Sequence, residues 1–92
     1  MYERVKAGTA SGAGTVAILA RRGWFHGMTY VGSGTAVTYD HPSAGTTAIA
    51  YVSAAANTTV GAMPPRPVFC NNGITCIVTT GGVATIYYED AP

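Results

Sequence analysis

Turn-forming residues interrupt this chain at short intervals, and their spacing restricts the fold more than any other feature of the sequence. Glycine, proline, asparagine and aspartate cluster about every 8 to 12 residues, and β-branched and aromatic side chains fill the segments between them. Only Ala54 to Ala56 favours a helix, and this segment is too short to nucleate one. We therefore expect short strands over residues 15–20, 24–32, 35–40, 46–53, 57–63, 68–70, 74–79 and 83–88.

Seven to eight short strands at this spacing are typical of an all-β fold. We expect a small antiparallel β-sandwich of jelly-roll or immunoglobulin-like type, formed by residues 15–92. Residues 1–14 are expected to form an extended N-terminal arm, because no bulky side chain follows Lys6 in this segment and little apolar area offsets the loss of chain entropy. We expect another chain to hold this arm in place.

The last two alternating runs, 74–79 and 83–88, are expected to pair as a hairpin. Its buried face should carry Ile74, Cys76 and Val78, whereas Thr75 and Thr79 should face solvent or a neighbour, because side chains alternate along a strand. The run 24–32 is expected to place four side chains on one face: Trp24, His26, Met28 and Tyr30.

The two cysteines are expected to be free thiols. If Asn72-Gly73 is a two-residue hairpin turn, Cys70 faces Thr75 and Phe69 faces Cys76, so the two thiols lie on opposite faces. Free buried thiols act as small apolar side chains, and they suit a protein made in a reducing cytoplasm.

Charge is scarce and unevenly placed. The chain has five Lys or Arg residues and four Asp or Glu residues, which is 10% of its length against a usual value of about 25%. Residues 41–65 and 67–88 contain none of these residues. Such uncharged stretches suggest surfaces covered by other subunits, although a threonine-rich surface without a partner is the alternative.

The same composition argues against two classes of partner. A net charge of +1 provides no basic patch for nucleic acid. No apolar run approaches the roughly 20 residues that a membrane-spanning helix needs, and the N-terminus lacks the continuous apolar segment of a signal peptide.

Four residues could suggest catalysis: His26, Asp40, His41 and Ser43. Asp40 and His41 are adjacent, so their side chains diverge and do not form a relay with a serine. Asp40 beside Pro42 is better explained as a turn cap. We therefore expect no enzyme activity and assign no catalytic residue.

Other chemical sites are also not indicated. The residues that could bind a metal, His26, His41, Cys70 and Cys76, lack closely spaced ligand pairs. Glu89 and Asp90 are assigned to a C-terminal tail and not to a pair of glycosidase carboxylates. Trp24 and the six tyrosines could form a sugar-binding platform, but at strand spacing they more often belong to a core or a subunit interface. No metal ligand or cofactor-binding residue is assigned.

The order of motifs over residues 23–89 resembles small β-sandwich structural proteins of tailed bacteriophages. An aromatic and glycine-bearing strand precedes "GTAVTYD", a glycine-bearing turn follows, a phenylalanine and "NGI" come next, and "GGVATIYYE" closes the domain. The sequence departs from the pattern in "WFHGM", which lacks an aliphatic residue, and in the proline-rich "PPRPVF". The strand order between residues 54 and 70 therefore stays open.

This resemblance implies a virion protein without catalytic residues. The protein would be a homotrimeric capsid decoration (cement) protein. It would be made in the host cytoplasm and bound to the major capsid protein or other virion subunits on the capsid surface. Fibre or spike domains and a carbohydrate-binding module are the alternatives. The residues expected at subunit interfaces are Tyr2, Arg4, Val5, Ile77, Tyr87 and Tyr88.

Overall fold

The fold is all-β and antiparallel, as expected from the sequence. The computed structural model describes residues 5–43 and 47–91, with the side chains of residues 56 and 57 left out. No helix occurs in these ranges, so none is present there that could span a membrane. The strands are β1 (Lys6–Ser11), β2 (Gly14–Leu19), β3 (Gly23–Tyr39), β4 (Ala48–Ala62), β5 (Val68–Cys70), β6 (Ile74–Val78) and β7 (Val83–Asp90).

β6 and β7 lie one after the other along the same edge of β3. Ala36 of β3 faces Val78, and Val31 faces Val83, so five residues along β3 match five residues along the β6–β7 segment, without an insertion. Thr79 continues this alignment, because its N–H donates a hydrogen bond to the carbonyl oxygen of Thr35 at 3.1 Å. β6, β7 and the residues between them therefore act as one long strand antiparallel to β3.

The neighbouring segments follow the same course. β1 pairs with β7, and β2 pairs with β6, so the β1–β2 segment runs along the outer edge of β6–β7. β4 pairs with β3 from residue 28 to residue 39. It lies on the other edge of β3, since Ala36 faces both Val52 and Val78. The sheet thus consists of four long segments, with the short β5 beside the start of β3.

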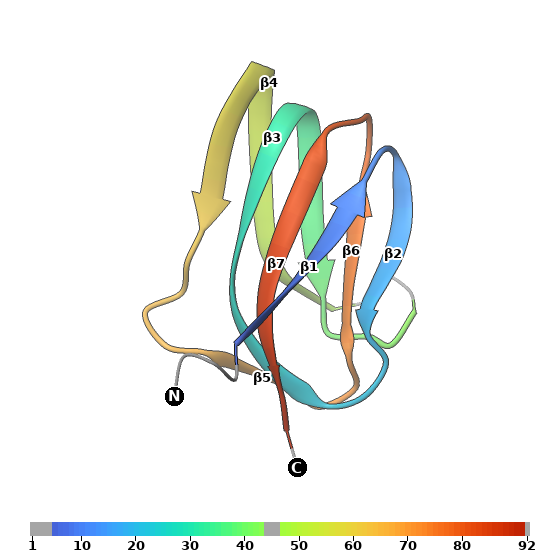
Figure 1. Ribbon diagram of the computed structural model, residues 1–92, viewed down its shortest axis with the longest axis vertical. Helices are drawn as coiled ribbons and strands as arrows, with labels where there is room; N and C mark the ends of the chain where they lie inside the picture. The colour runs from blue at the N-terminus through green and yellow to red at the C-terminus, as the bar shows by residue number, and fades with distance from the viewer. Residues whose placement is uncertain (1–4, 44–46, 92) are drawn as a thin grey trace.

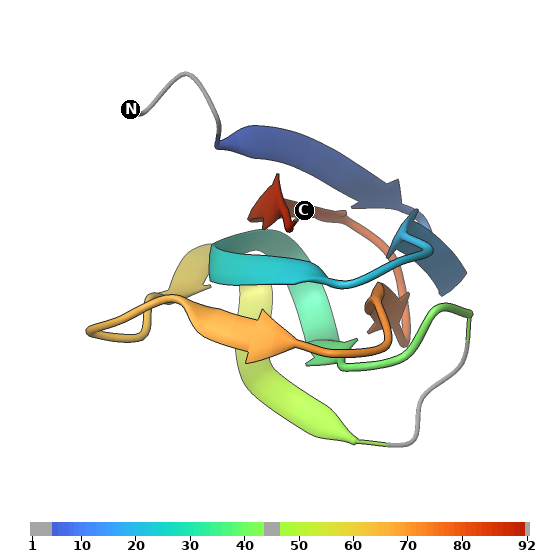
Figure 2. The ribbon, with the colours of Figure 1, turned by 90° about the horizontal axis from the view of Figure 1, so that it is seen from below.

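Each long segment bends near its middle, at the top of Figure 1, and the bends fold the sheet over on itself. The front layer contains β1, β7, residues 23–32 of β3 and residues 58–62 of β4. The back layer contains β2, β6, residues 34–39 of β3 and residues 48–54 of β4. The molecule is therefore a small sandwich that approaches a barrel, as the end view in Figure 2 shows.

Glycine and threonine form the bends, which we call the corners. Gly12 and Gly82 have φ values of +80° and +95°, in the region that favours glycine, and the Gly12 N–H donates to the Gly82 carbonyl oxygen at 2.9 Å. The hydroxyls of Thr35 and Thr79 lie 2.8 Å apart, so side chains join the two middle segments where they bend. The Tyr30 hydroxyl reaches from the core and donates to the Gly81 carbonyl oxygen.

The core lies between the two layers. Phe25, Met28, Ile74 and Ile86 are fully buried there. Thr38 is also fully buried, and its hydroxyl donates to the sulfur of Met28 at 3.2 Å, which satisfies a polar group that burial would otherwise penalise.

The prediction that residues 74–79 and 83–88 pair as a terminal hairpin is wrong. β6 and β7 do not pair with each other because the corner carries β7 along β3, whose 17 residues provide a longer ladder than a hairpin would. The inward placement of Ile74, Cys76 and Val78 is confirmed, as is the exposure of Thr79. The predicted exposure of Thr75 is wrong, because its side chain is fully buried and its hydroxyl donates to the His41 carbonyl oxygen at 2.7 Å.

The prediction of an N-terminal arm is also wrong for its described part, residues 5–14. Residues 6–11 form β1, which pairs over its whole length with β7, and Ala10 is fully buried. Small side chains do not prevent this pairing, because the backbone supplies the hydrogen bonds and Gly8 and Ala10 allow close approach of the layers. The structural unit therefore begins before residue 15.

The face assigned to the run 24–32 needs correction. The register of β3 against β7 shifts between Phe25 and Gly27, which makes His26 a bulge. Phe25, Met28 and Tyr30 consequently point inward, while Trp24 lies on the outside. A bulge adds one residue to the strand, so side chains before and after it no longer alternate in step. A prediction from strict alternation therefore assigns the wrong face on one side of the bulge.

Both cysteines are free, as expected, but not for the reason inferred from the sequence. Residues 71–73 are not the turn of a β5–β6 hairpin, because β5 pairs with β3. Instead, the Asp40 carboxylate accepts the N–H groups of Asn71 at 3.3 Å and Asn72 at 2.9 Å. Cys70 and Cys76 are both fully buried in the core, so they do not lie on opposite faces.

Candidate interaction surface

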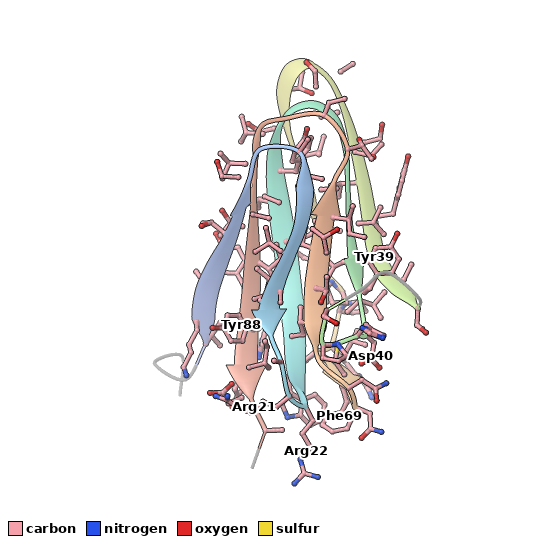
Figure 3. All side chains as sticks on the ribbon, turned by 90° about the vertical axis from the view of Figure 1, so that its right-hand side faces the viewer. Arg21, Arg22, Tyr39, Asp40, Phe69 and Tyr88 are labelled. Atoms are coloured by element: carbon pink, nitrogen blue, oxygen red, sulfur yellow. The ribbon has the colours of Figure 1, made fainter. Side chains whose placement is uncertain are left out.

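The described charged side chains gather at the end of the molecule opposite the corners. Lys6 begins β1, Glu89 and Asp90 end β7, and Asp40 follows β3. Arg66 lies in the link between β4 and β5. Figure 3 shows Arg21 and Arg22 at the same end and Asp40 in the same half. We call this region the charged end. It exists because the long segments begin and finish there, whereas their middles form the corners.

Asp90 is the centre of the charged end. Its carboxylate lies 2.8 Å from the Lys6 ammonium group and 3.0 Å from the Arg21 guanidinium group. The hydrogen bond from Lys6, followed by that from Arg21, lowers the pKa of Asp90, and the same bond from Asp90 raises the pKa of Lys6. These contacts connect β1 and the β2–β3 turn to the end of β7. They are exposed, so solvent and salt weaken them.

A second polar contact joins the imidazole of His26 to the carboxylate of Glu89 at 3.2 Å, with both side chains about a quarter exposed. The other residues that could have suggested catalysis lie in a turn. The Ser43 N–H donates to the His41 ring at 3.0 Å, and Asp40 caps residues 71 and 72. The structure therefore does not bring His26, Asp40, His41 and Ser43 into one relay. Among the described residues, no group of three or more metal-binding side chains occurs.

Aromatic side chains lie next to the charged end. Trp24 and Phe69 face each other on β3 and β5, and their ring centroids are 4.9 Å apart with a tilt of 60°. They are 37% and 42% exposed. The side chain of Met63, also exposed, lies over Gly27, where a Cβ atom would overlap its sulfur.

The front outer face is the outward surface of the front layer. Val31 and Val83 face each other on β3 and β7, and they are 47% and 42% exposed. A shallow depression continues from them over the corner, lined by residues 31–33 and 80–83. The valine pair continues into Ser11 on β1 and Thr59 on β4, so this row contains no charge.

The back outer face is the outward surface of the back layer, and it has a similar row. Ile77 of β6 faces Thr15 on one side and Val37 on the other, and Val37 faces Tyr51 of β4. Tyr51 is 61% exposed. This row also contains no charge, so the outer face of each layer has one charge-free row of side chains.

The interface residues predicted from the sequence do not form one patch. Ile77 is half-buried on the back outer face, whereas Tyr87 is half-buried on the front outer face. Tyr88 packs against the core, and Val5 is half-buried just before β1. Tyr2 and Arg4 lie outside the described residues.

Sequence reasoning missed Val31, Val83 and Tyr51 as exposed apolar residues. Their position inside uncharged strands could have marked them as candidates for a contact surface. Alternation alone, however, does not show which side of a folded sheet faces outward.

Comparisons with known proteins give no match to this chain among protein-family models, curated proteins or solved structures.

Proposed function

We propose that this protein is a structural subunit without a catalytic step, which packs the charge-free rows of its outer faces against other subunits. The observation that carries the proposal is the separation of charge, with the charged end at one end of the molecule and a charge-free row on the outer face of each layer. A face that stays in water is usually mixed in charge, which keeps a protein soluble and monomeric. Covering these faces removes exposed apolar area from water and leaves the charged end accessible.

The kind of assembly follows from the resemblance of residues 23–89 to small virion proteins of tailed bacteriophages. We place the protein on the capsid surface, as a decoration protein bound to the major capsid protein, with a fibre or spike domain as the variant within the same class. Small size supports this role, because a short chain buries a limited core and gains stability from a neighbour.

The test is to locate the protein on particles and then to disturb one outer face. Virus particles purified from the source culture are treated with a gold-labelled antibody against this protein and viewed by electron microscopy. We expect the gold to label the capsids. Val31→Lys combined with Val83→Lys should lower the amount of protein on particles at least tenfold, because two charges would have to be desolvated at the contact. Asn72→Lys, at an exposed turn near the charged end, is the control and should bind normally. Label that is absent from particles would contradict the proposal.

A second function is favoured by one observation, the exposed pair of Trp24 and Phe69. Sugars stack on exposed aromatic rings, and Glu89, which pairs with Trp24 in the ladder, could accept a hydroxyl hydrogen bond. A carbohydrate-binding module would give a glycan-array signal that Trp24→Ala abolishes and Tyr51→Ala leaves intact. Absence of a signal at high protein concentration would remove this alternative.

A further inference from the structure

One edge of the sheet, along β4, has no strand paired to it in the described residues. Within the described residues, β4 pairs with β3 alone, so its other edge is open along the strand. β4 spans 15 residues, whereas the edge on the opposite side of the sheet is divided between β1 and β2, which have six residues each. Along β4 the register against β3 shifts at Ile49 and between Ala54 and Thr58, so residues 50–54 and 58–62 are its two regular runs.

The directions of the backbone groups identify which residues of β4 are available. The Thr35 carbonyl oxygen accepts a hydrogen bond from Thr79 and so faces the β6 side. Backbone groups alternate in direction along a strand, so those of Ala36 face β4 and bond its partner Val52. Tyr51 and Ser53, on either side of Val52, therefore direct their N–H and C=O groups toward the open edge.

The β4 edge lacks the side chains that usually prevent strand pairing. Exposed edges are commonly protected by lysine, proline or an inward charge. Residues 48–62 contain no charged residue and no proline. Two register shifts against β3, one at Ile49 and one between Ala54 and Thr58, leave residues 50–54 as a regular run. The opposite edge, by contrast, carries Lys6.

We infer that the β4 edge pairs with the same edge of a second copy of this chain, antiparallel and about a two-fold axis, through residues 50–54. Charge is the reason for choosing a second copy. Antiparallel pairing of a strand with a second copy of itself about a two-fold axis brings equivalent residues close together. A charged residue would then lie near the same charge on the partner copy and repel it. β4 contains none, so self-pairing carries no such penalty. The exposed ring of Tyr51 would then pack against the back outer face of the partner copy.

The test is the oligomeric state of matched variants at one position. The wild-type protein should sediment as a dimer at micromolar concentration. Ser53→Pro removes an N–H that faces the open edge and leaves the ladder with β3 in place, so it should raise the dimer dissociation constant at least tenfold. Ser53→Thr keeps the N–H and should remain dimeric. Thermal unfolding followed by circular dichroism verifies the fold of each variant, and Tyr51→Lys is the second variant if the proline prevents folding.

Hydrogen exchange gives an independent reading at the same residues. The amides of Tyr51 and Ser53 should gain protection as protein concentration rises. A monomer at all concentrations, a dimer that Ser53→Pro leaves unchanged, or an open-ended polymer would overturn the inference. A trimer would also overturn it, yet it would leave the proposed structural function standing, because particle labelling tests that function separately.

Discussion

Individual residues in this protein take their roles from their distance to a corner. Lys6, Arg21 and Asp90 lie where strands begin or end, and they meet in one set of ion pairs. Residues between β6 and β7, such as Gly82 and Thr79, build a bend instead. The two cysteines lie in the core, where burial raises the pKa of Cys70 to about 12 and that of Cys76 to about 11.

The first prediction concerns these thiols. A thiol reagent attacks the thiolate, and both burial and the raised pKa values remove the thiolate at pH 8. We expect no measurable labelling of native protein over an hour and rapid labelling of two thiols per chain in urea. Fast labelling of either cysteine in the folded protein would show that the core between the layers opens readily.

At the scale of elements, the β6–β7 segment and β3 behave as two long strands that bend together. The bend keeps the register, so it requires backbone conformations that fit a tight corner without adding residues. Gly82 has a φ of +95°, and a Cβ atom there would overlap the carbonyl oxygen of Val31. Gly81 next to it has open space around a Cβ position.

The second prediction compares these neighbouring glycines. Gly82→Ala should lower the free energy of unfolding by about 1–3 kcal/mol, because alanine resists this φ and overlaps β3. Gly81→Ala should be neutral or slightly stabilising, since it only restricts the unfolded chain. Urea titration of both variants measures the difference. Equal effects would mean that the corner does not depend on the conformation of Gly82.

At the scale of the whole molecule, the N-terminal segment completes the front layer. β1 pairs with the edge of β7 and places Ala10 in the core, while Thr9 next to it faces outward. The charged end then closes around Asp90 through Lys6. Without β1, the β7 edge would be open and the interior between the layers would meet water.

The third prediction separates a strand from an arm. Ala10→Asp buries an unpaired carboxylate and should lower the free energy of unfolding by roughly 3 kcal/mol or more. Thr9→Asp is the matched control, because the same charge one residue away faces solvent and should change stability little. Similar stabilities for the two variants would indicate that residues 6–11 do not belong to the folded unit.

The sequence by itself determined the class of this fold and the location of most strands, because turn residues and alternating apolar residues act locally. Ile74, Cys76 and Val78 were therefore placed correctly. Only the tertiary structure decided which strands pair. Folding β3 at its middle removes the terminal hairpin, brings β1 into the sheet and sends Ile77 and Tyr87 to opposite outer faces. The physical reason is that a corner and a hairpin turn use the same residues, glycine and threonine. The choice between them depends on the ladder available along a distant strand.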